Sequence, residues 1–215
     1  MHVSHSASSQ PANASTAPLP GNEAPSILLQ APGAGLPPVE AFLARYLIFP
    51  LFCRRHSTKK ALHKLEADGE KILQLARQLP MAELNRPVLI PRLPGLEDSS
   101  RNWSVAMTIE HLHIVGQGVS GVLRCISMGQ KPPAVVGTAE VKPHGDVDPD
   151  IVLDAYEDFI VGFRDTVWNH LGPDFSTTHP HPWFGPLNSG QWLRMLAMHQ
   201  QLHAKQIQRI AQSLA

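Results

Sequence analysis

The sequence predicts an all-α fold, an up-and-down four-helix bundle that follows a disordered N-terminal tail. Four stretches of the chain place apolar residues at alternating spacings of three and four, the pattern of an amphipathic helix. Proline- and glycine-rich segments separate these stretches, and no strong strand signal is found between them. With 215 residues, 43% of them hydrophobic, the chain is long enough to bury a substantial core.

The N-terminal region is expected to differ from the rest of the chain. Residues 1–35 are rich in Ser, Ala, Pro and Gly and carry few large apolar side chains, which predicts a disordered tail. Residues 36–56 are predicted to form a short helical extension, in which Phe42 and Tyr46 favour a helix and Pro50 is expected to break it. We expect this extension to cover one end of the bundle; contact with a partner or a membrane surface is the alternative.

Residues 57–215 are expected to form the bundle itself. The first helix is predicted over residues 57–79. In the following segment, residues 80–101, Pro87, Pro91 and Pro94 argue against helix and central strand. The second helix is predicted from a serine N-cap over residues 104–127. The loop that follows has room for a short extended pair at about residues 134–141.

The third and fourth helices have clear start signals. Asp148 is a suitable N-cap, Pro149 suits the first helical position, and the Gly-Pro pair at residues 172–173 predicts the end of the third helix. The fourth helix is expected to begin after Asn188 and to continue towards the C-terminus. Asn188 and Gln191, three residues apart, resemble a capping box.

Three histidines form the candidate metal site. His199 and His203 lie one turn apart on the apolar stripe of the last helix, so both imidazoles project from the same face. His111 falls on the buried side of the second helix and can complete a set of three nitrogen ligands that leaves a metal at least one open position. Burying two adjacent imidazoles costs free energy unless something satisfies both. The alternative is that these histidines are hydrogen-bonded core residues with no role in metal binding.

Other candidate residues are weaker. His179 and His181 occur in a proline-rich loop and are expected to be solvent-exposed, with a second-choice role as ligands or substrate contacts. Catalytic residues stay unassigned. Glu110 falls on the solvated side of the second helix, and Glu157 and Asp158 on the third helix are candidates for a general base by proximity alone.

The composition excludes several classes of function. The 18 basic residues balance the 18 acidic ones, and no basic stripe is present, so nucleic acid is not an expected partner. The longest apolar run, residues 46–53, is far shorter than the roughly 20 residues of a membrane span, and no secretory signal is found. Cys53 and Cys125 form no CxxC pair, which favours a reduced, cytoplasmic protein.

Several familiar catalytic motifs are missing from the sequence. It contains no HExxH zinc-protease motif, no GxSxG nucleophile elbow and no glycine-rich phosphate loop. A di-iron bundle needs two Glu-x-x-His motifs and further glutamates, whereas this chain has only the pair of Glu110 and His113. The three-histidine site is therefore the strongest functional signal.

The segments around these histidines resemble a known family. Residues 103–112, WSVAMTIEHL, resemble the motif on the second helix of the DinB-like superfamily, where a Trp-Ser start precedes a ligand histidine by about two turns. The pair of His199 and His203, followed by Gln206-Ile207, is similar to the final-helix motif of that family. Residues 181–187, HPWFGPL, are similar to the lead-in to this helix in some DinB-like proteins.

The resemblance covers residues 57 to the end and implies a four-helix bundle with a divalent metal, often zinc or nickel, at His111, His199 and His203. Known relatives include thiol-dependent transferases, an isomerase that uses a low-molecular-weight thiol, and metal-dependent hydrolases. The expected function is that of a bacterial-type cytoplasmic metalloenzyme, whose metal activates water or a thiol toward a small-molecule substrate. The alternative is a non-catalytic bundle for dimerisation or partner binding, and a homodimer is compatible with both.

Overall fold

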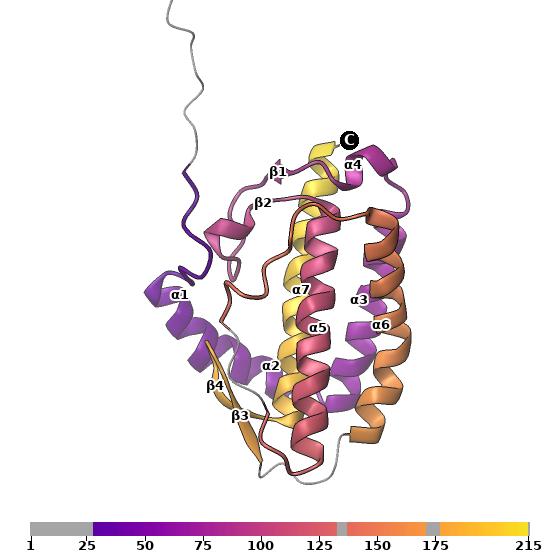
Figure 1. The fold of residues 1–215 in the computed structure, drawn as a ribbon. Helices are drawn as coiled ribbons and strands as arrows, with labels where there is room; N and C mark the ends of the chain where they lie inside the picture. Colours follow the sequence, from indigo (N-terminus) through magenta and orange to yellow (C-terminus); the bar gives the residue numbers. More distant parts are fainter. Residues whose placement is uncertain (1–27, 133–136, 171–176, 215) are drawn as a thin grey trace, which may run out of the picture.

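Four long helices form the body of the protein in the computed structural model, which describes residues 28–132, 137–170 and 177–214 (Figure 1). They are α3 (Thr58–Ala76), α5 (Val105–Ser127), α6 (Pro149–His170) and α7 (Ser189–Leu214). The all-α four-helix bundle expected from the sequence is thereby confirmed. Most of the predicted tail and the predicted Gly-Pro helix end at residues 172–173 lie outside the described residues.

The up-and-down order expected from the sequence is not found, because consecutive helices do not all alternate in direction (Figure 1). α3 and α5 each pack against both α6 and α7. Arg194, near the start of α7, donates a hydrogen bond to Thr58 at the start of α3, whereas Arg77, just past the end of α3, pairs with Glu157 in the first half of α6. α3 therefore runs parallel to α7 and antiparallel to α6, and the neighbours α5 and α6 run in the same direction (Figure 1).

Two parallel neighbours need a connection that returns along the whole bundle. Residues 128–148 make this crossover from the end of α5 back to the start of α6 (Figure 1). Residues 134–136 of the predicted extended pair lie outside the described residues, and residues 138–141 form a turn rather than a strand. Asn85 donates a hydrogen bond of 2.8 Å to the carbonyl of Val147 and holds the far end of the crossover.

The segment between α3 and α5 is more structured than its prolines predicted. It holds the short helix α4 (Met81–Leu84), strand β1 (Val88–Leu89), the 3₁₀ turn η2 (Asp98–Ser100) and strand β2 (Asn102–Trp103). β1 and β2 pair antiparallel. The prediction that excluded a helix here is wrong, because proline is incompatible with a helix interior but α4 begins directly after Pro80 and ends before Pro87.

A β-hairpin precedes the last helix, where the sequence predicted a loop. Its strands are β3 (Thr178–His181) and β4 (Gly185–Asn188), with Pro180 opposite Pro186. A two-stranded ribbon tolerates these prolines because both strands are edge strands. Gly185 adopts a φ of 75°, a backbone conformation that glycine takes without a steric cost.

The predicted helix starts are confirmed in detail. The Ser104 side chain accepts a hydrogen bond of 3.1 Å from the Met107 amide, and α6 begins at Pro149. Asn188 and Gln191 form a reciprocal capping box with amide-to-side-chain distances of 2.9 and 3.0 Å.

The N-terminal extension is one continuous helical segment made of α1 (Pro38–Leu43), the π-helical turn η1 (Ala44–Ile48) and α2 (Phe49–Arg55). The predicted break at Pro50 is not found. Proline is tolerated in the first turn of a helix, and Pro50 stands in the first turn of α2, directly after the wider π-helical turn. The segment packs against α7 and projects from the body of the protein (Figure 1).

The close packing of α5 on α6 depends on Gly116. A Cβ atom at this position would lie within 3.0 Å of three atoms of the buried Phe159 ring. We expect Gly116→Ala to destabilise the protein by roughly 1–3 kcal/mol, because the added methyl would force the buried Phe159 ring to shift within the core. Gly118→Ala is the matched control: no atom lies within 4 Å of its Cβ position, and it should stabilise the exposed helix face by about 0.5–1 kcal/mol. Urea unfolding would measure both, and equal shifts would contradict this account.

Candidate metal centre

Three histidines from two helices meet inside the bundle. The ligand atoms of His111 on α5 and of His199 and His203 on α7 all lie within 4.8 Å of one another. His111 and His203 are 6% and 3% exposed, and His199 is half-buried. The structure thus brings together the residues that the sequence singled out, because the i, i+4 pair on α7 faces the buried side of the antiparallel α5.

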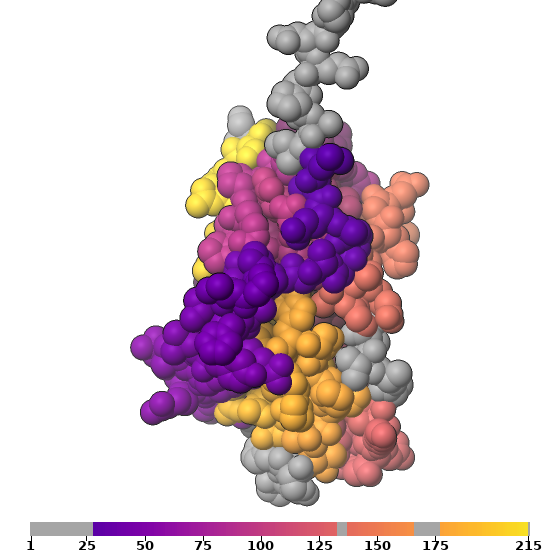
Figure 2. Space-filling model, turned by 90° about the vertical axis from the view of Figure 1, so that its left-hand side faces the viewer, coloured from indigo at the N-terminus to yellow at the C-terminus, as the bar shows by residue number. Residues whose placement is uncertain are grey.

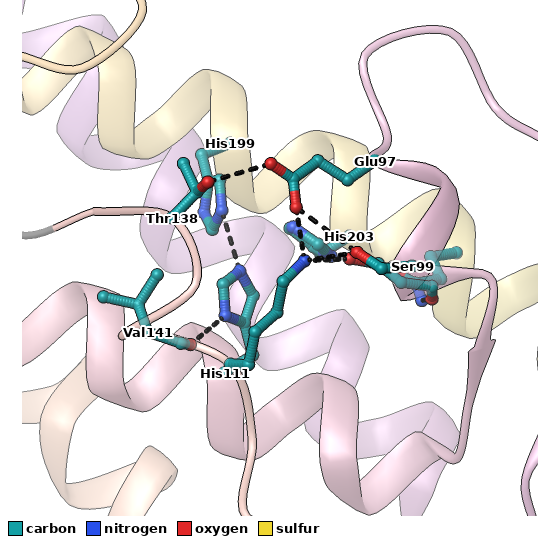
Figure 3. A network of polar contacts seen from close by, with 10 residues as sticks. Glu97, Ser99, His111, Thr138, Val141, His199 and His203 are labelled. Carbon is teal, nitrogen blue, oxygen red and sulfur yellow. Dashed lines mark hydrogen bonds and ion pairs between the residues drawn. The ribbon is translucent and has the colours of Figure 1, made fainter. Parts of the chain in front are cut away.

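The orientation of the His111 ring is fixed by the crossover. Its Nδ1 lies 2.6 Å from the carbonyl oxygen of Val141 (Figure 3). A carbonyl oxygen only accepts hydrogen bonds, so Nδ1 carries the proton and Nε2 of the neutral ring presents a lone pair. This Nε2 lies 3.1 Å from Nε2 of His199.

The His203 ring is oriented by a similar argument. The Gln206 amide nitrogen donates to the backbone carbonyl of Ser100 at 2.7 Å, which turns the amide oxygen of Gln206 toward His203. That oxygen lies 2.7 Å from Nδ1 of His203 and accepts its proton. His203 therefore also keeps the lone pair of Nε2 free, and a partner of this kind on the distal nitrogen is typical of metal-binding histidines.

Burial keeps all three rings neutral. The pKa of His111 is lowered to about 4, chiefly by burial and also by the charge of Lys142, which together outweigh the opposing effects of the Val141 hydrogen bond and of Glu97. Burial likewise holds the pKa of His199 and of His203 well below the ordinary value, with contributions from the neighbouring histidines and from Lys142. Neutral imidazole is the form that binds a metal.

The donor set fits a divalent transition metal. His199 Nδ1 is buried and has no hydrogen-bond partner among the described residues, and the Nε2 lone pairs of His111 and His203 have no donor among them other than His199. Three imidazole nitrogens suit zinc, nickel, copper or iron and leave at least one coordination position open. A cation between these nitrogens would satisfy lone pairs that otherwise face one another.

A buried ion pair that the sequence did not single out lies beside the histidines. The Lys142 ammonium donates to Glu97 at 2.6 Å, to Ser100 at 2.7 Å and to Ser99 at 3.1 Å, and Thr138 donates to the other carboxylate oxygen of Glu97 at 2.9 Å (Figure 3). Burial acts to raise the pKa of Glu97, but the Lys142 and Thr138 hydrogen bonds outweigh it and keep the pKa below the ordinary value.

This ion pair holds the crossover in place next to the carbonyl that orients His111. Lys142 directly follows Val141, whose carbonyl holds His111, so the bonds of Lys142 to Glu97 and the serines keep that carbonyl in place. Neither residue carries a periodic or motif signal, which is why sequence reasoning missed both.

The carboxylates considered as general bases do not reach the cluster. The expectation that Glu110 is solvated is wrong: it is 8% exposed and accepts hydrogen bonds from the amide and the ring of His144, because the crossover packs over this face of α5. Glu157 pairs with Arg77 at the surface, and Asp158 is exposed.

The two hairpin histidines are not the exposed loop residues that the sequence predicted. His179 is 6% exposed and stacks on Trp192, and His181 is half-buried, because the hairpin folds back onto α7. His181 Nδ1 accepts hydrogen bonds from the backbone amides of Trp183 and Phe184, so its Nε2 carries the proton. Burial lowers the pKa of His181 to about 4. Both histidines line the cavity described next, but neither belongs to the three-histidine cluster.

A cavity of about 800 Å³ opens beside the cluster. The three histidines, Glu97 and Lys142 are among its polar lining residues. The remaining wall is mainly apolar and comes from the N-terminal segment, α5, α7 and the hairpin; it includes Ile48, Phe52, Val115, Val119, Phe184 and Met198.

Comparisons with known proteins agree with this architecture. The sequence profile of the DinB superfamily matches residues 31–207. A mycothiol-dependent maleylpyruvate isomerase is similar in structure, with a TM-score of 0.57 and 13% identity over 72% of this chain and 62% of the isomerase. This chain therefore spans about three fifths of the length of the isomerase.

Two further solved structures are similar. YfiT from Bacillus subtilis, described as "a probable metal-dependent hydrolase with an unusual four-helix bundle topology", has a TM-score of 0.54 and 16% identity, over 73% of this chain and 87% of YfiT. TT2238, a four-helix bundle protein, has a TM-score of 0.49 and 28% identity, over 71% of this chain and 98% of TT2238. The search of curated proteins gives no match.

The buried neutral histidines predict a pH dependence for the metal-free protein. In the unfolded chain His111 takes up a proton near its ordinary pKa of 6.5, but in the folded protein only near pH 4. Its contribution to stability is therefore fully present above pH 6.5 and is lost as the pH falls toward 4, by up to about 3 kcal/mol. Urea unfolding of chelator-treated protein at several pH values would measure this slope.

His111→Asn should flatten that pH dependence. Gly118→Ala is the control: it removes no titratable group and should leave the slope unchanged. Identical slopes for the wild type and His111→Asn would contradict the prediction.

Proposed function

The chain belongs to the DinB superfamily, and from this premise we propose that it is a metal-dependent enzyme that activates water or a thiol. The observation that carries the proposal is the cluster itself: three neutral imidazoles face one another on the wall of a mostly apolar cavity. A structural zinc usually has four protein ligands, whereas three ligands beside a cavity leave room for water or substrate.

The residues of this chain would divide the work as follows. His111, His199 and His203 would hold a zinc or nickel ion, which when bound supplies a Lewis acid and lowers the pKa of a coordinated water or thiol. Val141 and Gln206 keep two of the rings turned toward the metal position.

The surroundings of the cluster support a role in positioning a substrate. The wall of the cavity is mainly apolar, and the charge of Lys142 is balanced by Glu97. His181 offers a hydrogen-bond donor rather than a base, because its Nδ1 already accepts two amide protons. Glu40 and Glu97 are the carboxylates that line the cavity among the described residues, and both are already paired, with Arg92 and Lys142.

The cavity favours a small-molecule substrate with an apolar body. Its volume lies in the range of sites for drug-sized ligands, and its lining is mainly apolar. The mycothiol dependence of the isomerase supports a low-molecular-weight thiol as a co-substrate, and YfiT supports hydrolysis as the other reaction type. We place the protein in the cytoplasm, where the free thiols of Cys53 and Cys125 stay reduced.

Metal content is the first test of this function. We expect about one divalent ion per chain in protein purified without chelator, and loss of that ion in His111→Asn, His199→Asn and His203→Asn. His113→Asn is the matched control, because His113 lies on the same helix but outside the cluster. Mass spectrometry of the metal and thermal unfolding with added Zn²⁺ or Ni²⁺ would provide the two readouts.

Turnover is the second part of the same test. The metal-loaded protein should hydrolyse apolar acyl substrates or transfer a thiol to an apolar electrophile, and His199→Asn should lose this activity while His113→Asn keeps it. A protein that holds no metal even after reconstitution, and whose melting temperature does not respond to either ion, would instead be a non-catalytic bundle.

A further inference from the structure

The N-terminal helical segment presents an apolar face to the outside of the protein. Six large apolar side chains follow one another at helical spacing along residues 38–55, and each is between 38% and 72% exposed. We call them the outer stripe; they are Val39, Phe42, Leu43, Tyr46, Leu47 and Leu51. A surface helix normally turns such a stripe toward the core, and contiguous exposed apolar patches mark interaction sites.

The outer stripe is not the surface of a loose tail. The opposite face of the same segment is anchored: Phe49 is 4% exposed and stacks on Phe184 of the hairpin with ring centroids 4.6 Å apart. Glu40 pairs with Arg92 at 2.6 Å. Figure 2 shows the segment, in indigo, projecting from one side of the molecule.

Unpaired cations border the outer stripe. Residues 38–60 contain five cationic side chains and one carboxylate, a net charge of +4 in a chain whose total is zero. The carboxylate is Glu40, which is already paired. The five cations are exposed and have no acidic partner among the described residues; they are Arg45, Arg54, Arg55, Lys59 and Lys60.

Arginines elsewhere in the described structure are commonly paired with carboxylates. The paired examples are Arg77, Arg86, Arg92, Arg101 and Arg164. The cations beside the outer stripe are therefore available to an external anionic surface.

We propose that the outer stripe and its cationic border dock on the surface of an anionic phospholipid membrane. Apolar side chains on one face and Lys or Arg at its border are the features of helices that lie in the membrane interface. No helix of the described residues is long and apolar enough to cross a bilayer, so the segment lies on the membrane rather than in it.

A second copy of the chain fits this surface less well than a lipid bilayer. In a two-fold symmetric dimer the same patch faces itself, which would bring the cations of both copies to one interface. Like charges across an interface oppose association, whereas each of these cations is attracted to an anionic leaflet. The docked segment also lines the cavity through Ala44, Ile48 and Phe52, so docking would set one wall of the cavity against the membrane.

Vesicle sedimentation tests the proposal with the full chain. We expect the protein to pellet with vesicles of phosphatidylcholine containing about 30 mol% phosphatidylglycerol and to stay in solution with pure phosphatidylcholine. The double variant Phe42→Ser and Leu47→Ser should weaken binding by about tenfold or more, because both side chains are more than half exposed and contribute to contact rather than to the core. Ile151→Ser with Val161→Ser is the matched control, since both residues are equally exposed but lie on α6.

Further variants separate the outcomes. Arg54→Glu with Arg55→Glu should abolish the preference for anionic vesicles, and high salt should do the same in the wild type. Wild-type protein that stays in solution with anionic vesicles would overturn the proposal. A dimer in sedimentation velocity would also overturn it, if the Phe42 and Leu47 variant were a monomer and bound vesicles as the wild type does.

The membrane proposal and the metal-dependent function fail independently. His199→Asn should bind vesicles as the wild type does, because the cluster lies inside the bundle and away from the outer stripe.

Discussion

The burial of three neutral imidazoles side by side is the constraint on which the rest of the site depends. Each ring must stay neutral, and its unprotonated nitrogen must at the same time face the other two rings. Burial provides the first condition, and acceptors on the distal nitrogens of His111 and His203 provide the second. The acceptor for His111 is the carbonyl of Val141 in the crossover. The acceptor for His203 is Gln206 on α7, whose amide is held by the carbonyl of Ser100. The loops around the bundle are therefore part of the site.

Local sequence signals predicted the parts of the structure that local physics determines. Helical periodicity located the four helices, and the caps at Ser104 and Asn188 were found where their side chains satisfy free amides. The i, i+4 spacing of His199 and His203 on an apolar stripe predicted that both would point inward, and both lie in the cluster with His111. The fold class and the candidate site could therefore be predicted together.

What the sequence missed is non-local. A helical wheel shows that Glu110 points away from the bundle but not that a later segment returns to cover it. Glu97 and Lys142 lie 45 positions apart in irregular segments, so no periodicity relates them. The sequence does not predict the direction of α6 either. Residues 128–148 are numerous enough to connect α5 to α6 whether the two helices run parallel or antiparallel, because an extended chain covers about 3.3 Å per residue against 1.5 Å in a helix.

The parallel arrangement of α5 and α6 has a consequence for how such a protein can diversify. A bundle with tight turns at every end would have to build its whole site from side chains on the helix faces, where each substitution disturbs the packing of the core. Here the crossover runs past the cluster and contributes Val141, Lys142 and Thr138 without belonging to the helical core. A different crossover would change the hydrogen bonds and charges around the histidines and leave the packing of the four helices unchanged. The fold therefore separates the helices, which must keep their core residues, from a connection that can vary.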